Sequence, residues 1–149
     1  MSILKDVLKT KCDDFDAPMT IPEGKWAFEV EDAGATDQKG DSPARVWFVL
    51  RPYAAGDDVD QEEAEEYLDG VEDRSPVFHS INVKNREGGY YVREFLRNIG
   101  VSIKGRDLED AVKESAGTKC SATVSHDANE KDPTRPWVRL RGFEAVSAE

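Results

Sequence analysis

Histidine and cysteine are scarce in this chain, whose 149 residues include only two of each. Cys12 and Cys120 lie far apart, and neither has the neighbours typical of a metal site or a disulfide framework. His79 and His126 stand outside any Ser, Cys or Asp pattern that would mark a nucleophile and its base. The sequence therefore predicts a protein that is not an enzyme and that holds no metal ion or other cofactor.

Long apolar runs are also absent from the sequence. No segment approaches the roughly 20 apolar residues of a membrane-spanning helix. Residues 1–11 alternate apolar and charged side chains and lack the apolar stretch of a secretory signal. We therefore expect a cytoplasmic protein that makes no membrane contacts.

Acidic residues, by contrast, are abundant. The chain has 31 aspartates and glutamates against 20 lysines and arginines, which gives a net charge of −11. Ten of these acids and a single base lie in residues 57–74, so that this segment carries −9 and the rest of the chain only −2. It falls within an acidic insertion that we place at residues 54–75. Exposed charges more than about 10 Å apart are screened at ordinary salt, so the acidity does not exclude a polyanionic partner elsewhere on the surface.

Apolar and polar residues alternate in five segments at the spacing of half-buried β-strands. Helical patterns separate the third segment from the fourth, and a short amphipathic helix stands near the N-terminus. The predicted strands are residues 25–31, 44–52, 76–84, 119–125 and 136–146, the helices between strands three and four are residues 90–99 and 107–116, and residues 34–43 form a loop.

This order of elements favours one fold class. Three strands, a helical region and two further strands are the order of an OB-fold, a partly open five-stranded barrel. An immunoglobulin-like sandwich would need about seven strands and no central helices. We expect a mostly β chain with minor α, in which residues 1–20 form an N-terminal helix and lead-in and residues 21–149 form an OB-like domain that contains the acidic insertion.

Two of the predicted strands place aromatic rings and arginines together on one face. Successive strand side chains alternate faces, so each strand has an apolar face for the core and an arginine-aromatic face left over. Flat rings stack unpaired bases and guanidinium groups hold phosphates, which predicts an interface for single-stranded nucleic acid. We expect base stacking by Trp47, Tyr53, Trp137 and Phe143, and phosphate contacts by Arg45, Arg51, Arg139 and Arg141.

Lys84 and Tyr90 complete the candidate site, because they lie at the junction of the third strand and its helix, where an OB groove could receive a strand. A bulge at Gly142 would turn Phe143 to the opposite face. A competing interpretation is that the acidic insertion or the N-terminal helix covers the face of the second strand, with its arginines paired to carboxylates.

Several segments carry a resemblance to a known family: IPEGKW at residues 21–26, VWFVL at 46–50, YVREFLRNIG at 91–100, GTKC at 117–120 and VSH at 124–126. They are similar to small bacteriophage proteins that bind single-stranded DNA through an OB-fold. The resemblance implies a protein that coats or protects unpaired strands in phage replication or recombination, in the host cytoplasm. RNA, replication or recombination proteins and further copies of the chain are additional candidate partners. Unlike better-known single-strand binders, the chain has no strongly acidic, phenylalanine-terminated tail.

Two other functions stay open on the sequence. The arginine-aromatic faces also suit a protein interface, as in a decoration or head-tail component of a phage particle, because Trp and Arg are favoured anchors there. Alternatively, the acidic insertion could imitate DNA and occupy a host nuclease or repressor.

Overall fold

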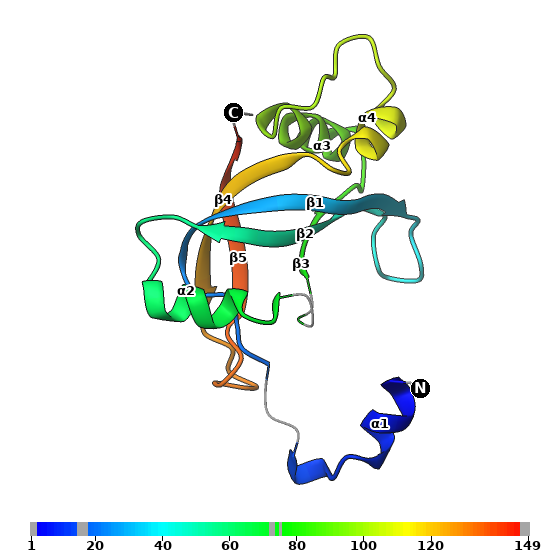
Figure 1. Cartoon of the computed structure of the whole chain (residues 1–149). Coiled ribbons are helices and arrows are strands. Elements are labelled where there is room, and N and C mark those ends of the chain that lie inside the picture. Colours follow the sequence, from blue (N-terminus) through cyan, green and yellow to red (C-terminus); the bar gives the residue numbers. More distant parts are fainter. Residues whose placement is uncertain (1–2, 15–17, 72–73, 75, 147–149) are drawn as a thin grey trace.

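A strongly curved β-sheet with helices at its ends forms the body of the computed structural model, which describes residues 3–14, 18–71, 74 and 76–146 (Figure 1). The strands are β1 (Gly24–Thr36), β2 (Arg45–Ala55), β3 (Val77–Asn82), β4 (Lys119–Asp127) and β5 (Trp137–Ala145). They form one sheet in the order β3-β2-β1-β4-β5, and every neighbouring pair is antiparallel. The expected mostly β class with five strands is confirmed.

Helices lie in both regions predicted between the third and fourth strands. α3 (Arg86–Asn98) and α4 (Leu108–Glu114) separate β3 from β4. However, α3 begins at Arg86 and not at residue 90, so that Gly88 and Gly89 are helical. α2 (Gln61–Leu68) lies within the acidic insertion, and the Asp60 carboxylate caps its N-terminus by accepting a 3.0 Å hydrogen bond from the amide of Glu63. α1 (Ile3–Lys9) buries none of its residues, and a short 3-10 turn, η1 (Cys12–Asp14), follows it. Among the described helices, none has the length and apolar character needed to cross a membrane.

The first strand is longer than its sequence pattern suggests. It continues to Thr36, although we expected residues 34–43 to form a loop. Residues 33–36 pair with residues 45–48 of β2, beyond register shifts at Ala27/Phe28 and Val30/Asp32. Each shift changes which side chains face the core. Apolar and polar residues therefore do not alternate regularly in the second half of β1, and the sequence pattern does not identify it as a strand.

The curvature of the sheet brings its two edges towards each other. β3 and β5 are the outermost strands, yet the rings of His79 on β3 and Phe143 on β5 have centroids only 4.7 Å apart. Phe95 of α3 packs against both rings, at 4.9 Å from His79 and 4.7 Å from Phe143. We call the space between these two edges the seam. Within the described residues, side chains and not backbone hydrogen bonds join β3 to β5, so the sheet is barrel-like but open.

The hydrophobic core lies inside the curved sheet and is capped by two helices. Trp26 of β1 and Phe48 of β2 are among its fully buried side chains. Tyr67 of α2 packs edge-on against Trp26 with centroids 5.6 Å apart, and Phe95 of α3 lies 4.4 Å from Phe48. Figure 1 shows α2 and α3 at opposite ends of the sheet. Each end of the core is therefore sealed by an aromatic contact to a helix.

The position of His79 predicts a pH-dependent stability. Burial between the Phe95 and Phe143 rings lowers the pKa of His79 from its usual value of 6.5. The unfolded chain therefore takes up a proton before the folded protein does, and the free energy of unfolding falls as the pH is lowered below about 6.5. Urea denaturation at about pH 7.5 and about pH 5.5 measures this loss.

The matched variant for this prediction is His79→Phe, which keeps a ring in the seam but cannot take up a proton. We expect the variant to lose less stability than the natural chain between the two pH values, with His126 present in both. A loss of equal size in both proteins would assign the effect to other groups and contradict the prediction.

Candidate nucleic-acid interface

The outer face of β2 and β3 carries two aromatic side chains close together. Half-buried and fully buried residues alternate along β2, with the half-buried Trp47 and Val49 on the outer face. β3 pairs with β2 so that Ser80 lies opposite Trp47 and Phe78 lies opposite Val49. We call the surface formed by Trp47, Val49 and Phe78 the outer platform. Its most prominent member is Phe78, which is 66% exposed.

Phe78 is not among the site residues predicted from the sequence, although a signal for it was present. In the third strand, Val77, His79 and Ile81 alternate with Phe78, Ser80 and Asn82, and the structure turns the first set inward. Phe78 is an aromatic residue of the outward set, so the alternation of strand side chains would have identified it as a candidate site residue.

The indole of Trp47 is held against β1 by a glycine. A Cβ atom on Gly34 would lie 2.5, 2.9 and 3.1 Å from Cζ2, Cη2 and Cε2 of Trp47, distances that place Gly34 under the face of the ring. The indole Nε1 donates a 3.1 Å hydrogen bond to Oγ1 of Thr36, the last residue of β1. One face of the ring is thus fixed on the sheet, and the side chain as a whole is half-buried. Such a ring is pre-organised for stacking.

A groove of about 440 Å³ runs along the seam beside the outer platform. Phe78 and Ser80 of β3 line one side of this seam groove, and Arg139 and Arg141 of β5 line the other. The two arginines belong to the second face predicted from the sequence, which lies at the opposite edge of the sheet in hydrogen-bonding order. Because Phe78 belongs to both surfaces, the curvature of the sheet unites the two predicted faces into one continuous surface.

The arginines of this surface differ in their partners. Arg45 and Arg141 are exposed, and neither forms an ion pair with any described residue. Arg139 pairs with Asp127 of the neighbouring strand β4. Arg45 and Arg141 are therefore the cations whose guanidinium groups are available to an anionic ligand.

The far end of β2 does not contribute to the outer platform. Arg51 lies 3.1 Å from the Glu31 carboxylate and donates a 3.0 Å hydrogen bond to the carbonyl oxygen of Val71. The ammonium group of Lys119 lies 5.3 Å from the centroid of the Tyr53 ring, in a stretch of β2 beyond the end of β3. Arg51 and Tyr53, both predicted as site residues, are thus engaged within the chain.

The residues of β5 are divided between two faces. Trp137 is 58% exposed, and Arg139 and Arg141 are also exposed on the outer face. Phe143, which the strand spacing assigned to the same face, is partly buried and packs in the seam instead. Gly142 has a φ of +67°, a left-handed conformation that favours glycine, and the pairing of β4 with β5 shifts register nearby. The bulge that could reverse Phe143 is therefore present.

The last two predicted residues lie at the β3–α3 junction. Lys84 is exposed there. Tyr90 is 48% exposed on α3, and the Arg93 guanidinium lies 4.9 Å from the centroid of its ring. Tyr90 lines a separate pocket between α3 and α4 and is not brought onto the outer platform.

Comparison of the chain with protein-family models and with curated proteins finds no match. The geometry of the outer platform and the seam groove therefore carries the functional argument.

The contact between Gly34 and Trp47 predicts a specific coupling. Gly34→Ala places a methyl group within 2.5 Å of the indole and must displace it, at a cost of about 1–3 kcal/mol in the free energy of unfolding. In a Trp47→Leu background the same change should cost far less, because the ring is gone. Chemical denaturation of the two single variants and the double variant measures the coupling. Equal costs in both backgrounds would show that Gly34 does not support the ring.

Proposed function

We propose that this protein binds single-stranded nucleic acid on the outer platform and along the seam groove. The observation that carries the proposal is the placement of two rings, Trp47 and Phe78, on one face, with Arg139 and Arg141 across the open seam from Phe78. Aromatic faces stack bases of any sequence, and arginines hold the phosphates between them. Single-stranded DNA is the first ligand to test, and RNA is the second.

The strand order supports the proposal. We infer that the curved sheet is an OB-fold opened between β3 and β5, since β1, β2 and β3 form a meander, β4 returns to pair with β1, and β5 follows β4. OB-folds bind oligonucleotides on the face of their second and third strands. The outer platform occupies this face.

The distribution of charge is compatible with a polyanionic ligand despite the net charge of −11. Among the described residues, the acids of the insertion cluster on and around α2, at the end of the core opposite α3. Asp127 is the one carboxylate that lines the seam groove, and Arg139 neutralises it. In the described part of the chain, the acids of α2 therefore do not line the seam groove beside Phe78.

In this proposal the protein coats or protects unpaired strands, the role implied by its resemblance to phage single-stranded DNA-binding proteins. One fold would cover on the order of 4–16 nucleotides with little sequence preference. The same rings and arginines could instead anchor a protein partner in a phage particle. Absence of binding in the titrations below would favour that role.

Loss of either platform ring should weaken binding strongly. We expect Trp47→Ala and Phe78→Ala each to raise the Kd for oligo-dT by about 5- to 150-fold, since each stacked base contributes about 1–3 kcal/mol. Tyr53→Ala is the matched control, because Tyr53 is an exposed ring of the same strand region but lies outside the platform. Fluorescence anisotropy of a labelled oligonucleotide measures the three affinities. A similar loss in all three variants would contradict the assigned surface.

The salt dependence of binding distinguishes Arg45 and Arg141, which have no ion-pair partner among the described residues, from Arg51, which is paired with Glu31. The affinity should fall as salt rises, and Arg45→Gln and Arg141→Gln should each reduce the slope of log K against log salt by about 0.7, the value for one phosphate contact on a single strand. Arg51→Gln should leave the slope unchanged, because the Arg51 guanidinium already binds Glu31 and Val71. An affinity that does not respond to salt would end the proposal.

A further inference from the structure

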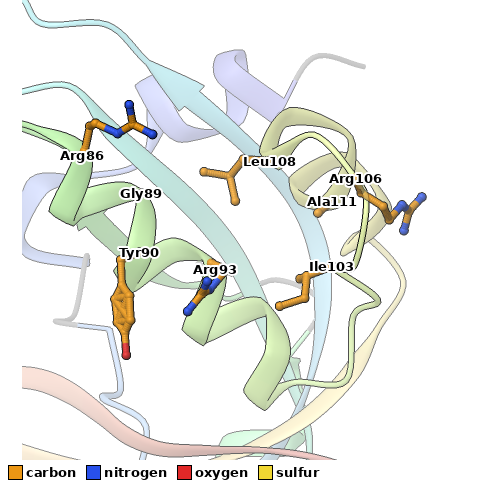
Figure 2. A pocket seen from close by; sticks show the side chains of 8 residues that line it. All are labelled: Arg86, Gly89, Tyr90, Arg93, Ile103, Arg106, Leu108 and Ala111. Atoms are coloured by element: carbon orange, nitrogen blue, oxygen red, sulfur yellow. The ribbon is translucent and has the colours of Figure 1, made fainter.

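A second pocket lies between α3 and α4, with a volume of about 400 Å³ (Figure 2). Arg86, Tyr90 and Arg93 line it from α3, while Ile103 and Leu108 contribute an apolar surface between the two helices. Arg106 lines it from the loop before α4, and its guanidinium pairs with Glu114 of that helix. None of the described carboxylates lines this pocket. We call it the helix pocket. It combines the positive charges of Arg86 and Arg93 with an aromatic ring and an apolar surface.

Gly89 in the wall of the helix pocket is not explained by packing. A glycine inside a helix costs about 1 kcal/mol relative to alanine. The neighbouring Gly88 has a packing reason, since a Cβ there would lie 2.7 Å from the Cα atom of Val83. A Cβ on Gly89 would meet only Leu108, at 4.0 Å. The absence of a side chain at Gly89 therefore leaves space on the pocket side of α3, between the Arg86 and Arg93 turns.

Two arginines of α3 supply the positive charge of the helix pocket. Arg86 forms no ion pair with any described residue. Arg93 lies 3.5 Å from Glu94, and its guanidinium packs over Tyr90. Each arginine carries five N–H donors, so a single carboxylate partner leaves donors of Arg93 for a ligand. Two such groups on one helix face match the charge and the acceptor oxygens of a phosphate dianion.

From these contacts we infer that the helix pocket binds the phosphate monoester of a nucleotide. Arg86 and Arg93 hold the phosphate, and the sugar and base lie over Gly89 against the ring of Tyr90 and the apolar side chains of Ile103 and Leu108. Pockets for ligands of this size measure about 300–1,000 Å³. The nucleotide can be free or can be the phosphorylated end of a strand. Only the second source rests on the proposed strand binding.

The two sources are distinguished by two titrations. Calorimetry with dTMP, and with thymidine as the ligand without a phosphate, tests the free nucleotide. Competition between dT oligonucleotides with a 5′-phosphate, a 3′-phosphate or neither tests the strand end. We expect dTMP to bind and thymidine to bind at least about tenfold more weakly, since the phosphate makes the charge-assisted contacts. A preference for a phosphorylated strand assigns the strand end as a source, and its absence assigns the free nucleotide.

Variants of α3 provide the controls. Arg86→Gln and Arg93→Gln should each weaken dTMP binding at least about fivefold, as expected for the loss of a charged hydrogen-bonding partner. Arg97→Gln is the matched control, because Arg97 pairs with the same Glu94 at 3.1 Å but does not line the pocket. Failure of dTMP to bind at millimolar concentration, or an equal loss in the Arg97 variant, would overturn the inference. Unmodified oligo-dT then reports separately on the outer platform.

The variant Gly89→Ala tests whether Gly89 leaves space for a ligand or has only a structural role in α3. Alanine fits the helix at this position, so the melting temperature should rise, while the added methyl group occupies the pocket and weakens dTMP binding. A purely structural glycine would give a higher melting temperature with unchanged binding, and that result would overturn the inference.

Discussion

The contact of His79, Phe95 and Phe143 across the seam is the interaction on which the shape of the seam groove depends. It joins an edge strand, a helix and the opposite edge strand, with ring centroids between 4.7 and 4.9 Å apart. Aromatic packing is compatible with a gap between the strand backbones, whereas a ladder of hydrogen bonds would hold them within about 5 Å. The sheet is therefore curved and capped like a barrel while its seam keeps a groove of about 440 Å³. The groove follows from this incomplete closure, which leaves it beside the outer platform on β2 and β3.

Separation of charge is the second organising feature. The acidic insertion contributes most of the net charge, and α2 within it packs at the end of the core opposite α3. The pair between Arg51 and Glu31 lies between this acidic end and the outer platform. Arg45 and Arg141, beyond that pair, keep their guanidinium groups unpaired within the described structure. An acidic protein can in this way present a cationic and aromatic surface, because the charges that oppose a polyanion lie elsewhere on the fold.

The helices combine two roles on opposite faces. The inward face of α3 carries Phe95, which seals the core against Phe48. Its outward face carries Arg86, Tyr90 and Arg93 along one stripe, and α4 encloses that stripe into a pocket. A helix whose inner face is fixed by packing is a rigid support for side chains on its outer face. This arrangement lets a helix that caps the core also form the wall of a pocket.

The sequence by itself determined the strands, the order of the elements and the alternation that puts Trp47 outside and Phe48 inside, because these depend on local periodicity. Even the reversal of Phe143 was readable as a consequence of Gly142. Tertiary structure alone decided which outward side chains meet. Phe78 is a candidate site residue because the pairing of β3 with β2 places it near Trp47. Arg51 is not available to a ligand because it pairs with Glu31, a residue of another strand. The meeting of β3 with β5 across the seam depends on the summed bend of several strands, and no local pattern of residues encodes that sum.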